Sequence, residues 1–198
     1  MIPGHHKRLK INLVSSSNMS TISETTTDKP VYPLHEQWTL WYGRWDAPAQ
    51  VMSFTTLNDF WSLFNNIKCP TNLPPKMDYH LFKHGIEPKS EDTNNVDGGS
   101  LSVECSHHEI EKFWLHTVLA TIGNNFTDQD YICGMMINVR PKFGRIQLWL
   151  KNCTDNNILK RIGTEWKQHI ECHYRQQVKY TTHHDIFVKQ DLRPKLVI

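Results

Sequence analysis

The chain has little net charge and no long apolar run. It carries 22 Lys and Arg residues against 20 Asp and Glu residues, a formal net charge of +2 over 198 residues. A protein that coats nucleic acid is strongly basic, so any nucleic-acid contact here must be local. No apolar stretch reaches the roughly 18 residues that span a bilayer, and the polar N-terminus does not look like a secretory signal. We therefore expect a cytoplasmic protein without a membrane segment.

Cysteine pairs and catalytic motifs are also lacking. The five cysteines are scattered without a CxxC pair, which disfavours a disulfide framework and a zinc module. Cys105, His107 and His108 could be drawn as metal ligands, but no second ligand pair stands at zinc-finger spacing. The strings GxxxxGK[ST], GxGxxG, HExxH and GxSxG are all absent from the sequence. We expect no metal, no cofactor and no enzymatic activity.

Tryptophan, in contrast, is abundant. The seven tryptophans are Trp38, Trp41, Trp45, Trp61, Trp114, Trp149 and Trp166. Indole is a large ring that either packs in a core or stacks on another ring, such as a nucleobase. Composition alone leaves both interpretations open.

One domain is expected at this length. Residues 1–30 are rich in Ser and Thr and have no apolar periodicity, so we predict a disordered N-terminal arm there and a single domain over 31–198.

Within the domain, strand-like and helix-like patterns alternate. We predict strands around 38–42, 77–82, 100–104, 133–140 and 145–151, with a hairpin at 141–144 and a weakly alternating tail from Val178. We predict helices over 56–67, over 108–122 with a left-handed cap at Gly123, and from a Thr154 cap through Trp166. This order favours an α+β fold in which helices cover one face of a curved, mainly antiparallel sheet, leaving the other face available for binding.

Several strings resemble successive blocks of one known family. They are YPLHEQWTLWY, TTLNDFWSLFNNI, DYHLFKHGIEPKSED, IEKFWLHTVLATIG, ICGMMINVR and IQLW. Together they resemble the mRNA cap-binding translation initiation factor 4E family from about Val31 to Lys189. The resemblance implies an eight-stranded sheet backed by three helices on its convex face. It also implies a monomer that binds the 5′ 7-methylguanosine cap of mRNA and links it to an initiation scaffold protein.

The implied cap site combines three kinds of group. The 7-methylguanine ring is cationic, so indoles sandwich it while a carboxylate accepts hydrogen bonds from its edge and basic side chains bind the phosphates. By resemblance, the candidate base-binding residues are Trp45, Ser90, Glu91 and Trp149. The candidate phosphate-binding residues are Arg140, Lys142, Arg145 and Lys189.

Ser90 is the main departure from the family pattern, because the family places its second sandwich ring at this position. A stacked aromatic ring contributes roughly 1–3 kcal/mol in single-strand binders. Three hypotheses follow: another side chain closes the pocket, the ligand is a modified cap or includes the second nucleotide, or cap recognition has been lost. Tyr42 and Phe143 are the candidate substitutes for the missing ring.

A second surface is expected on the helical side, where family members bind a scaffold or repressor helix with a Tyr-x4-Leu-apolar motif. By resemblance it comprises Tyr32, Pro33, Leu34, Leu57, Trp61 and Leu119. We expect Trp61 to be exposed there, and His116 stands where the family commonly has a glutamate. The alternative function is a divergent member with weak or altered cap specificity, acting as a translational repressor or scaffold-sequestering module.

Overall fold

The computed structural model describes residues 30–152, 154–172 and 176–198. Residues Val31–Ile198 form one compact unit. The N-terminal arm predicted for residues 1–30 lies outside the described residues, apart from Pro30.

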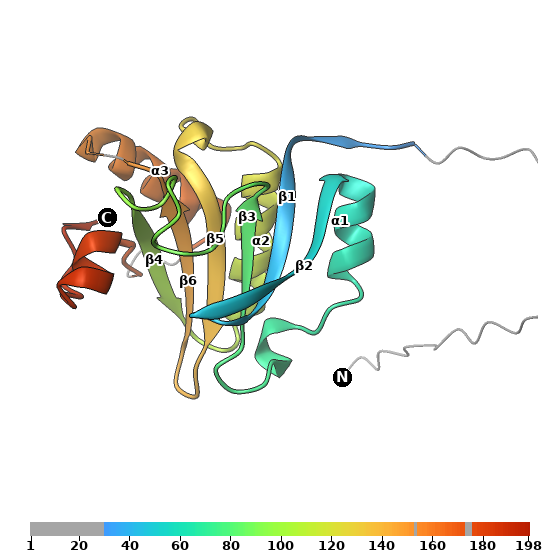
Figure 1. Cartoon of the computed structure of the whole chain (residues 1–198), viewed down its shortest axis with the longest axis horizontal. Helices are drawn as coiled ribbons and strands as arrows, with labels where there is room; N and C mark the ends of the chain where they lie inside the picture. The colour runs from blue at the N-terminus through green and yellow to red at the C-terminus, as the bar shows by residue number, and fades with distance from the viewer. Residues whose placement is uncertain (1–29, 153, 173–175) are drawn as a thin grey trace, which may run out of the picture. The chain divides into compact units, whose positions relative to one another are not determined.

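The unit is built on one eight-stranded antiparallel sheet (Figure 1). Its strands are β1 (Pro33–Arg44), β2 (Ala47–Thr56), β3 (Asp78–Lys83), β4 (Gly99–Cys105), β5 (Ile132–Val139), β6 (Gly144–Leu150), β7 (Lys179–Thr182) and β8 (Leu196–Val197). They lie in the order β2-β1-β3-β5-β6-β4-β7-β8, and every neighbouring pair is antiparallel. The predicted α+β class is therefore confirmed.

Three α-helices accompany the sheet: α1 (Leu57–Phe64), α2 (Ile110–Ile122) and α3 (Asn156–His169). Short helical turns are η1 (Pro70–Asn72), η2 (Gln129–Tyr131) and the π-helix η3 (His184–Val188). In the described part of the chain, no helix combines the length and apolar character needed to cross a membrane.

The predicted helix boundaries are right to within a few residues. Thr56 caps α1 as expected, with its hydroxyl accepting a hydrogen bond from the Asp59 amide at 3.0 Å. The left-handed cap predicted at Gly123 is wrong, since Gly123 has a φ of −79° and Asn124 takes the left-handed conformation at 57°. The cap of α3 is Asp155 rather than Thr154, and its carboxylate accepts from the Asn157 amide at 2.7 Å.

Strand β2 is missing from the sequence prediction. Its N-terminal half contains Ala47, Pro48 and Ala49, residues that weaken a strand pattern. Pro48 is tolerated because β2 is an edge strand, where the lack of a backbone N–H for pairing with a neighbouring strand costs little. Strand β1 likewise extends beyond the predicted residues 38–42 in both directions.

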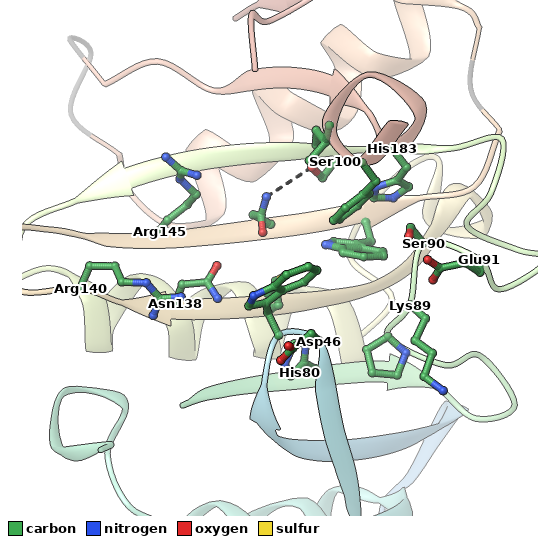
Figure 2. A pocket seen from close by; sticks show the side chains of 17 residues that line it. Asp46, His80, Lys89, Ser90, Glu91, Ser100, Asn138, Arg140, Arg145 and His183 are labelled. Carbon is green, nitrogen blue, oxygen red and sulfur yellow. Dashed lines mark hydrogen bonds between the residues drawn. The ribbon is translucent and has the colours of Figure 1, made fainter. Parts of the chain in front are cut away.

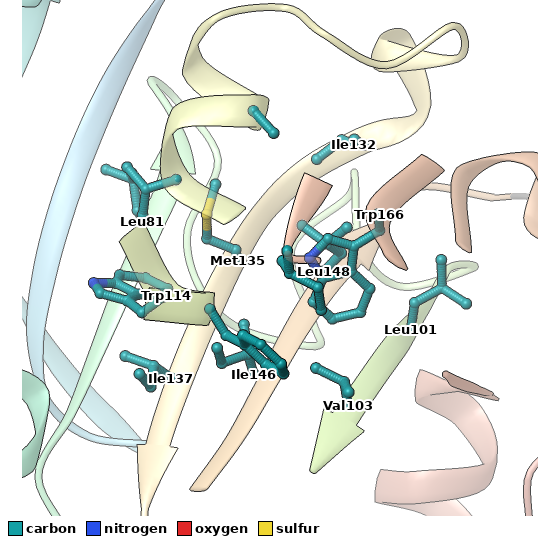
Figure 3. Close-up of a cluster of buried hydrophobic side chains, with 14 of the residues drawn as sticks. Leu81, Leu101, Val103, Trp114, Ile132, Met135, Ile137, Ile146, Leu148 and Trp166 are labelled. Atoms are coloured by element: carbon teal, nitrogen blue, oxygen red, sulfur yellow. The ribbon is translucent and has the colours of Figure 1, made fainter. Parts of the chain in front are cut away.

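The two faces of the sheet differ because side chains alternate along each strand. On the face toward the helices, residues such as Leu81, Met135, Ile146 and Leu148 pack with Trp114 and Trp166 in a continuous core (Figure 3). We call this the helical face. The opposite face, which we call the open face, carries a smaller cluster of Phe82, Cys133, Met136 and Trp149. The core thus occupies one face and leaves the other for a binding site.

Candidate functional site

A cavity of about 500 Å³ lies on the open face of the sheet. Its walls come from β3, β4, β5 and β6, the β1–β2 turn, the β3–β4 loop and the segment around η3 (Figure 2). Six of the eight residues predicted for ligand binding line this one cavity: Trp45, Ser90, Glu91, Arg140, Arg145 and Trp149. Segments far apart in the sequence are therefore brought to one place.

Trp45 stands in a tight turn between β1 and β2. Arg44 pairs with Ala47 across the ladder, so only Trp45 and Asp46 connect the strands. The Arg44 guanidinium spans this turn and donates to both carboxylate oxygens of Asp46, at 3.1 and 2.9 Å. Gly43 has a φ of 151°, and a Cβ there would lie 2.8 Å from the Ala47 carbonyl oxygen. This turn presents an indole that is 54% exposed.

The loop that carries Ser90 and Glu91 is held by internal hydrogen bonds. The fully buried Asn95 donates through its side-chain amide to the carbonyls of Glu87 and Lys89, at 2.9 and 2.8 Å. The Asp92 carboxylate accepts from the Glu87 amide at 2.9 Å. Among the described residues, none donates a hydrogen bond to the exposed Glu91 carboxylate. Glu91 is therefore available as an acceptor on a well-defined loop.

Arg140 and Arg145 lie toward the end of the cavity away from Ser90 and Glu91 (Figure 2). The Arg140 guanidinium donates to the buried Asp78 carboxylate at 3.0 Å and remains about one-third exposed. Burial raises the pKa of the Asp78 carboxyl, and the hydrogen bond from Arg140 opposes that shift. Arg145 pairs with Glu104 at 2.6 Å. Two fixed cationic groups thus form one end of the cavity.

The two predicted lysines are not brought to the cavity. Lys142 is exposed in the β5–β6 turn and does not line it. Lys189 lies after η3, where its ammonium donates to Asp185 at 3.0 Å.

Neither predicted substitute for the missing ring lies in the cavity. Tyr42 packs with Tyr79 at a ring-centroid distance of 5.5 Å on the helical face. Phe143 lies under the Arg145 guanidinium at 5.7 Å. Instead, Phe187 of η3 faces Trp45, with ring centroids 6.1 Å apart and planes inclined by only 18°. Sequence reasoning missed Phe187 because it lies in the segment that matched the family least.

Two histidines, His80 and His183, are among the other lining residues that the sequence prediction missed. His80 lies on the same face of β3 as Asp78 and Phe82, because side chains two residues apart along a strand share a face. A period-two pattern could therefore have placed His80 on the open face. Burial lowers the pKa of each imidazole to about 4, which keeps both neutral at pH 7. The His183 ring packs on Trp149 with centroids 4.1 Å apart.

Several buried nitrogens of the lining residues have no hydrogen-bond partner among the described residues. They are both ring nitrogens of His80 and of His183, Nε1 of Trp149 and Nε of Arg145. Buried polar groups in native proteins are nearly always paired, and an unpaired group costs about 1–3 kcal/mol. Such groups gathered around one cavity indicate a site that a polar ligand or water completes.

The six residues predicted to bind a peptide helix lie on the helical side. The Leu57 amide donates to the Tyr32 carbonyl at 2.8 Å, which ties the start of β1 to α1. Tyr32 is 56% exposed, whereas Leu34, Leu57 and Leu119 are partly buried against the core. The expectation that Trp61 is exposed is wrong, because its ring packs on Phe60 and Phe64 at 4.9 and 5.9 Å. Pro33 is exposed and pairs with Thr56.

Fold and cavity together define a class of protein: a ligand-binding α+β domain whose open sheet face offers aromatic rings, an acceptor carboxylate and a cationic end. Comparison with known proteins specifies the family. The Eukaryotic initiation factor 4E family model matches residues 33–195, and the chain belongs to that family.

Relatives and solved structures agree. The chain is 35% identical over 174 residues to Eukaryotic translation initiation factor 4E-1 of Triticum aestivum, covering 83% of this chain and 80% of the relative. The structure resembles C. elegans eIF4E-3 in complex with the 4E-binding protein Mextli and cap analog, with a TM-score of 0.79, 34% identity and coverage of 85% and 100%. It also resembles Ascaris suum eIF4E-3 in complex with m2,2,7G cap, with a TM-score of 0.78, 34% identity and coverage of 85% and 99%.

Proposed function

We propose that this protein binds the 5′ 7-methylguanosine cap of mRNA in the open-face cavity. The observation that carries the proposal is the polarity of that cavity. The Glu91 carboxylate lies at the opposite end of the cavity from Arg140 and Arg145 (Figure 2). The indole of Trp45 lines the same space of about 500 Å³. A capped end has the same polarity, because its cationic base is joined to an anionic phosphate chain.

The proposed roles follow from this arrangement. Trp45 stacks on the methylated base, whose positive charge strengthens the attraction to the electron-rich indole face. Glu91 accepts hydrogen bonds from the N1 and N2 edge of the guanine, as the resemblance implies. Arg140 and Arg145 bind the phosphates, and Trp149 contributes its indole to the same cavity.

We also propose that the helical side links the cap to an initiation scaffold. One neighbour, C. elegans eIF4E-3, was solved in complex with the 4E-binding protein Mextli. In this chain, the exposed Tyr32 and the half-buried Leu57 and Trp61 offer a surface for an amphipathic Tyr-x4-Leu helix. The role is one of binding in the cytoplasm rather than catalysis.

One observation favours a second candidate function. Ser90 leaves the β3–β4 loop without the ring that the family places there. A cap site weakened in this way, beside an intact peptide surface, would make the protein a repressor or scaffold-sequestering module.

Calorimetric titration with 7-methyl-GTP and with GTP tests the first proposal. We expect tighter binding of the methylated nucleotide, because only that base carries the positive charge. Trp45→Ala and Glu91→Gln should each weaken it roughly ten- to a hundredfold. Lys142→Ala is the matched control, since Lys142 is an exposed cation outside the cavity. Equal affinity for both nucleotides, or none for either, would refute the cap-binding proposal and favour the second function.

A further inference from the structure

We propose that Phe187, from η3 near the C-terminus, supplies the second aromatic face of the base site. This inference rests on the proposed cap-binding function. The family's second ring is replaced by Ser90 here, and the proposal places its substitute in a segment about a hundred residues further along the chain.

Ring geometry is the first support. The Trp45 and Phe187 rings are inclined by 18°, and their centroids are 6.1 Å apart. Stacked bases are separated by about 3.4 Å, so a base held between two rings needs them about 7 Å apart. The centroid distance is the upper limit of the spacing between the two ring planes, so the rings must move apart by about 1 Å or more to admit a planar base. Near-parallel faces are the arrangement such a sandwich requires.

Packing of the rings is the second support. Phe187 is partly buried against the open-face cluster, and its ring centroid lies 6.3 Å from that of Trp149. Both rings line the same cavity as Ser90 and Glu91. The three rings therefore line one cavity together with the carboxylate proposed to read the base edge.

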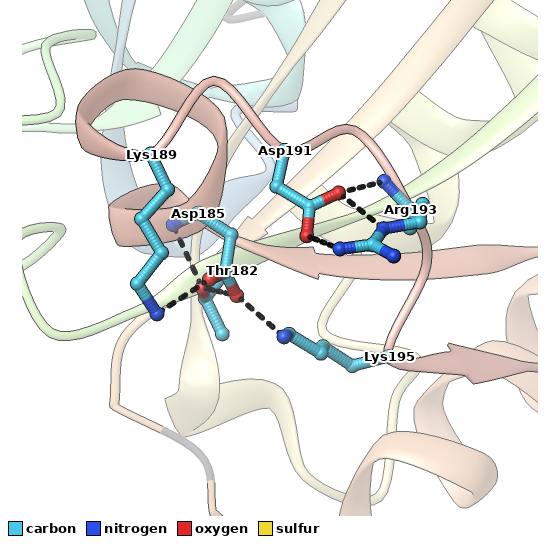
Figure 4. Close-up of polar contacts among 6 residues, drawn as sticks. All are labelled: Thr182, Asp185, Lys189, Asp191, Arg193 and Lys195. Carbon is cyan, nitrogen blue, oxygen red and sulfur yellow. Dashed lines mark hydrogen bonds and ion pairs between the residues drawn. The ribbon is translucent and has the colours of Figure 1, made fainter.

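A dedicated set of contacts fixes the segment that carries Phe187 (Figure 4). The Asp185 carboxylate, which is 3% exposed, accepts from the Thr182 hydroxyl at 2.5 Å and from the Lys189 ammonium at 3.0 Å. Lys195 from the chain before β8 adds an ion pair at 3.3 Å. These contacts tie η3 to the end of β7 and to the residue that precedes β8. Asp185 is therefore a positioning residue for the Phe187 ring.

Substitution of Phe187 tests the inference by titration with 7-methyl-GTP. We expect Phe187→Ala and Phe187→Leu to weaken binding roughly tenfold or more, while Phe187→Trp retains it. The leucine variant preserves apolar packing and removes only the π-face. Val188→Ala is the matched control, because Val188 lies in the same π-helix and is 68% exposed. Thermal unfolding of each variant verifies that the fold is intact.

A rescue experiment separates a stacking role from a structural one. In the Phe187→Ala background, Ser90→Trp should restore affinity, because it returns a ring to the position that the family uses. No restoration would mean that Phe187 acts by holding the C-terminal segment, which would overturn the inference.

The outcomes also separate the two proposals. If Trp45→Ala loses binding while Phe187→Ala and Phe187→Leu bind like the wild type, cap binding stands and the inference is wrong. If the wild-type protein binds neither nucleotide, the proposed function fails, and the inference that rests on it fails too.

Discussion

At the residue scale, the two buried histidines should make folding stability depend on pH. His80 and His183 are 1% and 2% exposed, and burial lowers the pKa of each imidazole to about 4. In the unfolded chain both return to about 6.5, so between these values the unfolded state binds more protons. The stabilisation is complete above about pH 6.5 and is lost as the pH falls toward 4.

We expect the free energy of unfolding to be smaller at pH 5 than at pH 7.5, by about 2 kcal/mol for each imidazole. Urea denaturation of the wild type, of His80→Phe and of the exposed-site control His35→Gln would measure this. The phenylalanine variant should lose a substantial part of the acid sensitivity, and the control should keep it. If His80→Phe kept the pH profile of the wild type, a lowered pKa of the His80 imidazole would not be a cause of the acid sensitivity.

Resemblance to the family predicted six of the seventeen residues that line the cavity, and it failed to find the ring that lies in a divergent segment. Glu91 and Arg140 stand in strings that resemble the family, and Trp45 follows another such string by three residues, so their convergence could be expected. Ser90 indicated that a ring was missing, but the predicted substitutes, Tyr42 and Phe143, pack elsewhere. Phe187 becomes visible only when the fold brings η3 beside the β1–β2 turn.

At the element scale, the β3–β4 loop depends on one buried amide. Asn95 donates to two carbonyls of that loop, and removal of its side chain leaves both without this donor. Asn95→Ala should therefore lower stability by about 1–3 kcal/mol and weaken 7-methyl-GTP binding, because Glu91 loses its support. Chemical denaturation and calorimetry would measure the two effects. The control Thr93→Ala, at an exposed position in the same loop, should change neither the stability nor the nucleotide affinity. If Asn95→Ala bound 7-methyl-GTP as tightly as the wild type does, Glu91 would not need the support of Asn95.

Helices and strands were predictable where apolar residues repeat at a regular spacing. They were not predictable where the position of a strand in the sheet decides which residues it accepts. The apolar stripes of α1, α2 and α3 gave three helices at nearly the right residues. Strand β2 was missed because Pro48 reads as a turn signal, whereas an edge strand accepts it. The π-helix η3 has no periodic apolar pattern in the sequence that would indicate it.

At the scale of the whole molecule, the two faces of one sheet separate the proposed functions. The cavity residues lie on the open face, and the residues proposed to hold a peptide helix pack on the helical side. The core between them is continuous and closely packed, with Leu148 and Ile146 fully buried on the helical face. Sites without shared contacts usually contribute independently to binding energies. The architecture thus predicts two sites that can be disabled one at a time.

Paired variants test this separation. Tyr32→Ala should weaken binding of a Tyr-x4-Leu peptide and leave 7-methyl-GTP affinity unchanged, while Trp45→Ala should do the reverse. Trp61→Ala should also lose the peptide, but its half-buried ring packs on Phe60, so that variant needs an unfolding measurement beside it. Val31→Ala, at a neighbouring position that is 66% exposed, is the matched control for Tyr32. Calorimetric titrations of each ligand, alone and with the other already bound, would give all the affinities. If Tyr32→Ala lowered nucleotide affinity as strongly as Trp45→Ala does, the two faces would be coupled through the core, and the separation argued from the sheet would be wrong.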